Sequence, residues 1–249
     1  MKLIAVIDMR GGYGVRASAG MGRGCYPFLR APFPVRIVPL VDRLYHAYGF
    51  RHIYIADLDA LMGKKEAWVY YHLYRMLEGL FPDVTFYVDG GFRSVCQVRR
   101  FYRFVRGHQI IPVICTECFC GTEDWIRIKR LMRGRVVLSL DYRNDYLLGG
   151  TYIGRAVGLW SSYMLVMALD AIGRGGARGM KRGGAIQERG RRYGSEQHFK
   201  GCFLAGGVGC FQHLVTAQEQ GFAGVLLSST LYGGVFSASQ LQNWNKSLR

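Results

Sequence analysis

Several short motifs in the first half of the chain recur, in the same order, in the second half. Each motif follows a short apolar run of the kind that forms a buried strand. The matched sequences are Asp8 with Asp141, DLDAL at 57–61 with ALDAI at 168–172, DGGFR at 89–93 with AGGVG at 205–209, and VICTE at 113–117 with LLSST at 226–230. The repeat predicts one domain over 1–249, built from two related halves at about 1–134 and 135–249.

Strand patterns alternate with helical patterns along the whole chain. Parallel strands with right-handed crossovers are typical of such alternation, and eight repeats at this length indicate a (β/α)8 TIM barrel. The predicted strands are 3–7, 52–61, 85–93, 110–117, 136–142, about 162–172, 202–209 and 224–234, and the predicted helices include 34–48, 68–80, 95–105, 124–132 and 213–220.

Two helices of this pattern look eroded. The sequence after Asp141 has little helical periodicity, so we expect the fifth helix to be shortened or lost. Glycines interrupt the segment from Arg174 to Gly201, and Met180 and Ile186 are nearly its only aliphatic residues. Because glycine disfavours helix, we expect a degenerate sixth helix and a disordered or mobile segment. A glycine-rich stretch after Asp8 is a candidate lid.

Composition narrows the class of protein. Half of the 249 residues are hydrophobic, no apolar run is long enough to span a membrane, and no signal-peptide pattern is present. We therefore expect a cytoplasmic protein whose seven cysteines are reduced. The net charge of +16 is consistent with attraction of anionic small substrates, with a compositional bias, or with nucleic-acid binding. We do not expect nucleic acid as a partner, because the basic residues are spread over many segments.

Asp8 and Asp141 are the leading catalytic candidates. The carboxyl ends of barrel strands meet at one mouth, so these two carboxylates would lie across it from each other. Such a pair can act as general base and general acid if its surroundings separate the two pKa values. The alternative is a structural pair that binds loop N–H groups. Asp59 and Asp170 form a second matched pair, which we interpret mainly as partners for the barrel's arginines.

The two double-glycine motifs predict phosphate binding. Glycines at a strand end let backbone N–H groups approach an anion, and the next helix adds its positive N-terminus. The alternative is that both motifs are tight turns, but two matched copies favour two phosphate sites and a small-molecule substrate with a phosphate at each end. The predicted phosphate residues are Gly90, Gly91, Arg93 and Thr116 in the first half and Gly206, Gly207, Gly209, Ser228 and Ser229 in the second.

Two further motifs are open to more than one interpretation. CTECFC at 115–120 has cysteines at close spacing, but cysteine in a buried strand behaves as a small apolar residue, so we expect no bound metal. The basic segment 174–200 resembles arginine–glycine segments that bind RNA. We favour the alternative that it is a solvated connection with a basic bias, and a third interpretation is a lid whose arginines close on a phosphate.

With these motifs the chain resembles the HisA/HisF family, which comprises the phosphoribosyl isomerase of histidine biosynthesis and its cyclase relative. The resemblance covers nearly the whole chain and is weakest at 143–160 and 174–200. The spacing of Asp8, Gly12, Val15, Arg16 and Gly20 matches the family's first-strand motif. DLDAL resembles VDLDGA, DGGFR resembles GGGIR, SLDYR resembles SLDVR, AGGVG resembles SGGVG, and LSSTLYGG resembles GKALYEG.

This resemblance implies an isomerase barrel that needs no cofactor and acts on a bis-phosphorylated ribotide. The reaction is an Amadori rearrangement of an aminoaldose to an aminoketose, with Asp8 as base and Asp141 as acid. The family's Asp-Gly-Thr on the sixth loop is replaced here by Gly175, Gly176 and Ala177. Asp170 stands where the family has a threonine, which makes it a third catalytic candidate.

These departures are similar to those of a divergent paralogue. DGGFR, ICTE and the SSTLY ending resemble HisA-like paralogues of methylotrophs, found beside genes for one-carbon cofactors related to methanopterin and methanofuran. The hypotheses are therefore an isomerase of histidine biosynthesis, a paralogue acting on a related phosphorylated intermediate, or a non-catalytic barrel that binds a phosphate ligand or a partner protein. The sequence leaves the oligomeric state open.

Overall fold

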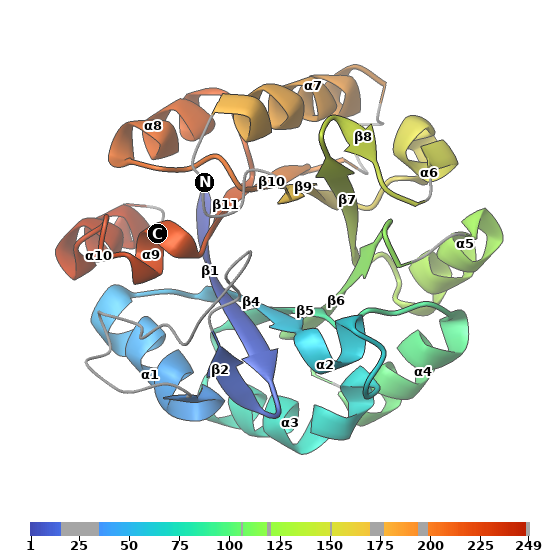
Figure 1. Ribbon diagram of the computed structural model, residues 1–249, viewed down its shortest axis with the longest axis horizontal. Helices are drawn as coiled ribbons and strands as arrows, with labels where there is room; N and C mark the ends of the chain where they lie inside the picture. The colour runs from blue at the N-terminus through green and yellow to red at the C-terminus, as the bar shows by residue number, and fades with distance from the viewer. Residues whose placement is uncertain are drawn as a thin grey trace.

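The computed structural model describes residues 1–15, 35–105, 107–118, 121–149, 151–169, 177–193 and 199–247. Eight parallel strands form a closed barrel, and helices surround it on the outside (Figure 1). The barrel closes where the first strand pairs in parallel with the last, with Lys2 beside Gly224 and Ala5 beside Leu227. The structure therefore confirms the (β/α)8 barrel that the alternating pattern predicts.

The barrel strands are short apolar runs, most of them four to seven residues long. In order around the barrel they are β1 (Lys2–Arg10), β4 (His52–Asp57), β5 (Thr85–Asp89), β6 (Ile110–Cys115), β7 (Val137–Arg143), β9 (Tyr163–Ala168), β10 (Gly201–Ala205) and β11 (Gly224–Leu227). The last strand is shorter than the sequence predicts. Its continuation forms the short helix α9, where the Tyr232 amide donates to the Ser228 carbonyl oxygen at 2.9 Å.

The helices lie around this barrel, and the longer ones each bury an apolar face against it. They are α1 (Ile37–Tyr48), α2 (Leu58–Leu61), a 3-10 turn at Ala67–Tyr70 followed by α3 (Tyr71–Leu80), α4 (Val95–Phe104), α5 (Thr122–Leu131), α6 (Thr151–Arg155) with a 3-10 turn at Val157–Leu159, α7 (Ala177–Tyr193), α8 (Phe211–Glu219), α9 (Ser229–Tyr232) and α10 (Ala238–Lys246). As predicted, α1 ends at Gly49, which is in the left-handed region at φ 73°. The fifth helix is shortened as predicted, since α6 has five residues.

Two small hairpins extend matching strands above the barrel. β2 (Tyr13–Val15) pairs antiparallel with the end of β1, and β8 (Tyr146–Leu147) pairs antiparallel with the end of β7. A further short strand, β3 (Val35–Arg36), pairs with β2. Asp8 and Asp141 consequently lie inside their strands and not at the strand ends. The candidate lid falls largely on 16–34, outside the described residues.

Aromatic side chains fill the end of the barrel where the strands begin. The Tyr163 and Phe203 rings stack with centroids 5.0 Å apart, and Tyr87 meets Phe203 edge-on at 5.3 Å. The Lys2 ammonium lies 4.7 Å above the Tyr163 ring. Large side chains therefore fill this end of the barrel, and the carboxyl ends of the strands, where the sites of such barrels lie, meet at the opposite end.

The prediction of a degenerate sixth helix and a disordered segment at 174–200 is wrong for residues 177–193. Residues 177–193 form α7, a regular helix of 17 residues, and Met180 and Ile186 are both buried on its inner face. Three of its glycines lie on this same face. A Cβ at Gly183 would lie 2.8 Å from the Phe222 ring, and one at Gly190 would lie 2.3 Å from the Phe199 ring. Here glycine permits close packing, so its usual helix penalty does not identify a disordered segment.

Within these described ranges, no helix combines the length and the apolar character that a membrane crossing requires.

Candidate active site

A cavity of about 230 Å³ lies at the carboxyl ends of the barrel strands. Its floor consists of barrel-lining apolar side chains such as Val6, Ala56 and Leu226. Its polar lining comprises Asp8, Tyr54, Asp89, Cys115, Glu117, Asp141, Ser228, Ser229 and Thr230, with the backbone of Gly206 and Gly207. Among the described residues, no lysine or arginine lines this cavity.

Asp8 and Asp141 lie on opposite sides of the cavity. They come from β1 and β7. The strands β4, β5 and β6 lie between these two strands in the barrel (Figure 1). Asp8 is half-buried, whereas the Asp141 residue is 3% exposed. The two carboxylates therefore have different surroundings, which is the condition for one to act as a base and the other as an acid.

Hydrogen bonds fix the Asp141 carboxylate from two sides. The Ser139 hydroxyl donates to Oδ1 at 2.7 Å, and the Glu117 amide donates to Oδ2 at 3.2 Å. Burial raises the pKa of Asp141 to about 7, and the nearby charge of Asp89 adds to this rise despite the hydrogen bonds. A large fraction of Asp141 is therefore protonated near neutral pH.

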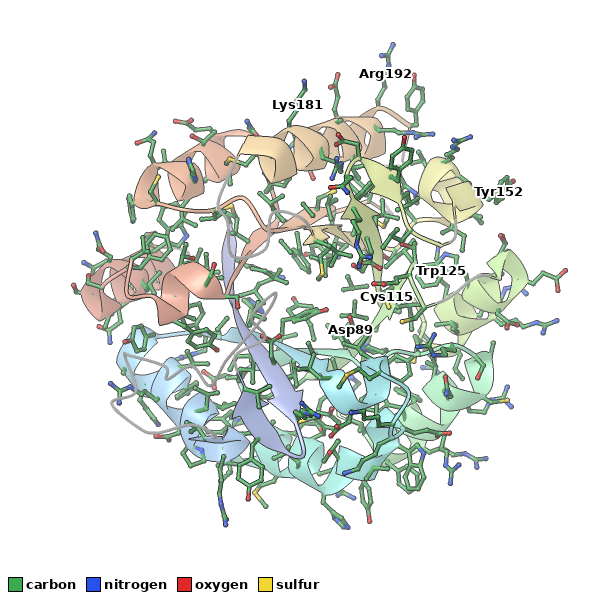
Figure 2. All side chains as sticks on the ribbon, viewed as in Figure 1. Asp89, Cys115, Trp125, Tyr152, Lys181 and Arg192 are labelled. Carbon is green, nitrogen blue, oxygen red and sulfur yellow. The ribbon has the colours of Figure 1, made fainter. Side chains whose placement is uncertain are left out.

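Asp89 is a site residue that the sequence reasoning missed. The Tyr54 hydroxyl donates to its Oδ2 at 2.8 Å, and the Gly91 amide donates to its Oδ1 at 3.2 Å. Burial raises the pKa of Asp89 to about 6. Figure 2 places Asp89 and Cys115 near each other at the centre of the barrel. DGGFR was interpreted through its glycines, although its carboxylate at a strand end was the same signal that identified Asp8 and Asp141.

The second-half glycine motif opens onto the cavity. Gly206 and Gly207 line it, with φ of 83° and 98°, and Ser228 and Ser229 line it from the next strand connection. Consecutive glycines with positive φ turn the backbone sharply at the end of β10. Gly209 is not in the lining, and its amide donates to His213 Nδ1 at 3.0 Å.

The first-half glycine motif opens onto a different cavity. Gly90, Gly91 and Arg93 line a second space of about 540 Å³ together with Lys64, Lys65 and Gln97. A Cβ on Gly91 would lie 2.8 Å from the Leu61 Cα, and an Arg93 Nη donates to the Leu61 carbonyl oxygen at 3.1 Å. Leu61 of α2 lines the first cavity and Ala60 lines the second, so α2 lies between the two spaces, and phosphate binding at both motifs stays a prediction.

Thr116 lines neither cavity. It is 1% exposed, and its hydroxyl oxygen accepts a hydrogen bond from the Asp141 amide at 3.1 Å. The structure thus gives Thr116 a contact to the backbone of a predicted catalytic residue. Phosphate contact through this hydroxyl stays a prediction.

The second carboxylate pair is described only in part. Asp59 accepts hydrogen bonds at 2.7 Å from the Gly11 amide and from the Tyr70 hydroxyl, which fixes the turn of the β1–β2 hairpin. Against the effect of burial, the hydrogen bonds from Tyr70 and Gly11 lower the pKa of Asp59, and the charges of Lys65 and Arg10 add to this fall, which is in line with the arginine partner that we expected. Asp170, with Gly175 and Gly176, lies outside the described residues.

A closed barrel with polar groups gathered at the carboxyl ends of its strands belongs to the class of (β/α)8 proteins whose sites lie at that face. The family model described as histidine biosynthesis protein matches residues 2–237, so the chain belongs to the HisA/HisF family. No curated protein matches the chain. Membership confirms the resemblance inferred from the motifs and leaves the reaction itself to be proposed.

Proposed function

We propose that this barrel is an isomerase of the HisA type, which converts a phosphorylated aminoaldose into the corresponding aminoketose. The observation that carries the proposal is the position of Asp8 and Asp141 on opposite walls of one cavity, with Gly206, Gly207 and two serines at its rim. The arrangement supports assigning a base and an acid to the two sides of a sugar-sized space and phosphate binding to its rim.

In this proposal Asp141 is the general acid. Ring opening of an aminoaldose requires a proton on the ring oxygen while the glycosidic nitrogen pushes its electron pair toward C1. A carboxyl with a pKa of about 7 carries this proton near neutral pH, and it becomes a carboxylate once it has donated the proton. The Ser139 hydroxyl and the Glu117 amide then stabilise the carboxylate that forms.

Asp8 is the general base. After ring opening, C2 of the iminium intermediate loses a proton to a carboxylate on the opposite side of the sugar, which gives an enolamine. Tautomerisation to the ketone, with a proton returned to C1, completes the aminoketose. Every proton stays within the active site and its substrate, so the scheme needs no external oxidant or reductant.

The described lining of the cavity favours a paralogue over the histidine enzyme itself. Among the described residues its walls are acidic, and the first-half motif contributes Asp89 to them, whereas the second-half motif contributes Gly206 and Gly207. A substrate with one phosphate at the Gly206–Ser229 side fits this arrangement better than a bis-phosphorylated ribotide. Intermediates of one-carbon cofactor synthesis are the first such candidates to test.

The test is turnover by purified protein, first with the bis-phosphorylated aminoaldose ribotide and then with mono-phosphorylated aminoaldoses. We expect Asp8→Asn and Asp141→Asn each to lower kcat by at least about 100-fold, because a general acid or base contributes about 10²–10⁴-fold. Asp42→Asn is the matched control, since Asp42 is an exposed aspartate on α1.

Four outcomes separate the alternatives. Turnover of the ribotide identifies a histidine-pathway isomerase, and turnover of a mono-phosphorylated aminoaldose alone identifies the paralogue. Full activity of both aspartate variants contradicts catalysis by this pair. Tight binding of phosphorylated ligands without turnover supports the non-catalytic barrel instead.

A further inference from the structure

Two cysteines meet in one tight turn at the barrel mouth. Cys115 is the last residue of β6, and the Cys118 amide donates to the Cys115 carbonyl oxygen at 3.2 Å. A hydrogen bond between these positions defines a β-turn, whose end Cα atoms lie within about 7 Å. This spacing overlaps the about 4.4–6.8 Å that a disulfide requires.

The side chains of this pair also face each other. The proximity of the two thiols raises the pKa of Cys115 and lowers the pKa of Cys118. Burial adds to the rise at Cys115, and the charge of Arg93 adds to the fall at Cys118. Cys115 is 4% exposed, whereas Cys118 is half-buried.

This difference matches the division of labour in a thiol–disulfide pair. The accessible thiol of lower pKa is the one that attacks, because the thiolate is the nucleophile. The buried thiol of higher pKa then resolves the mixed disulfide. The isomerase proposal assigns no chemical step to either thiol, although Cys115 lines the cavity.

We propose that Cys115 and Cys118 form a redox-active dithiol that exchanges with low-molecular-weight disulfides such as glutathione disulfide. The Cys118 thiolate attacks one sulfur of the external disulfide and releases one thiolate. The Cys115 sulfur then attacks Cys118, its proton passes to the second departing thiolate, and a Cys115–Cys118 disulfide forms. The two cysteines are oxidised and the external disulfide is reduced to two thiols.

The turn couples this pair to the candidate acid. Thr116 and Glu117 lie between the two cysteines, and both hold Asp141, one through its hydroxyl oxygen and one through its amide. Pulling the two sulfurs into a covalent bond reshapes the same four residues. Oxidation is therefore expected to change binding or turnover at the cavity, although formation of the disulfide does not depend on the isomerase proposal.

The experiment uses the reduced full-length protein, incubated with glutathione disulfide at neutral pH and analysed by intact mass and peptide mapping. We expect loss of two hydrogens from the peptide that contains both cysteines, with complete reversal by dithiothreitol. Cys118→Ser should abolish this change, and Cys96→Ser is the matched control because Cys96 is exposed on α4. Cys120→Ser should leave the bond in place.

Three results would each overturn the proposal. A stable glutathione adduct on Cys118 without an internal disulfide would mean that Cys115 does not resolve it. A bond that maps to Cys120, or no modification of Cys118 under conditions that modify Cys96, would also overturn it. The mapping is done on the unmodified sequence, so a folding defect in a variant cannot decide the result.

Discussion

Three buried carboxylates carry charges that the fold disfavours. Burial raises the pKa of Asp57 and of Asp89 to about 6 and that of Asp141 to about 7. Asp89 and Asp141 line the candidate active site, while Asp57 caps the short helix α2 and is 0% exposed. Each raised value means that the folded protein holds a proton more tightly than the unfolded chain does.

Asp57→Asn is therefore expected to stabilise the protein above pH 6. Asparagine keeps the cap on the Ala60 amide and removes a buried charge. The folded pKa is raised, so the wild-type carboxyl stabilises the fold fully only below its unfolded value, and this advantage disappears as pH rises from about 4 to about 6. We expect a gain on the order of 2 kcal/mol at pH 8. The gain should vanish near pH 3.5, where urea unfolding of both proteins should give equal free energies.

Asp89 is expected to set the proton affinity of Asp141. Its negative charge raises the pKa of Asp141, so Asp89→Asn should lower that pKa. The alkaline limb of the kcat/KM profile should then move to lower pH, since the acid loses its proton earlier. Carbon-13 NMR titration of the aspartate carboxyls would show the same shift without any substrate. An unchanged Asp141 titration, with Asp42→Asn as control, would contradict this role.

At the scale of elements, two neighbouring glycines of α7, Gly183 and Gly184, have opposite effects on stability. A Cβ at Gly183 would lie 2.8 Å from Phe222 and 3.0 Å from Leu204. A Cβ at Gly184, one residue further on, would lie 3.8 Å from the Gln220 side chain, which is an ordinary contact. The first glycine is needed for packing, and the second only weakens the helix.

This contrast gives a matched pair of variants. Gly183→Ala should destabilise the protein by about 1–3 kcal/mol, because an added methyl group must displace an aromatic ring and a leucine in the core. Gly184→Ala should stabilise it by up to about 1 kcal/mol through helix propensity. Thermal unfolding monitored by circular dichroism measures both. Equal effects of the two changes would show that α7 does not pack through Gly183.

For the whole molecule, the chain ends meet at the closure of the barrel. α10 packs against α1, the Gln242 amide donates to the Ala47 carbonyl oxygen at 2.9 Å, and the Trp244 indole donates to the Met1 carbonyl oxygen at 3.3 Å. Together with the pairing of β1 and β11, these contacts join the first and last elements (Figure 1). Neither half can form this closure alone.

Leu241→Ala tests whether the barrel unfolds as one unit. Leu241 is fully buried, and its truncation should cost about 2–5 kcal/mol. If 1–249 is a single domain, tryptophan fluorescence and circular dichroism should show one coincident transition at lower urea concentration. Asn243→Ala on the exposed side of α10 is the control. Two separate transitions would instead indicate half-barrels that unfold independently.

The sequence by itself determined the barrel, the matched halves as a hypothesis and the facing pair Asp8 and Asp141. Buried strands and the residues that follow them are local patterns, and a parallel barrel brings all such positions to one mouth. Only the tertiary structure decided that α2 lies between the cavities lined by Gly206 and by Gly90, that Asp89 lies beside Asp141, and that glycines pack α7 against the barrel. Each of these depends on contacts between residues far apart in the chain, which local propensity and spacing do not encode.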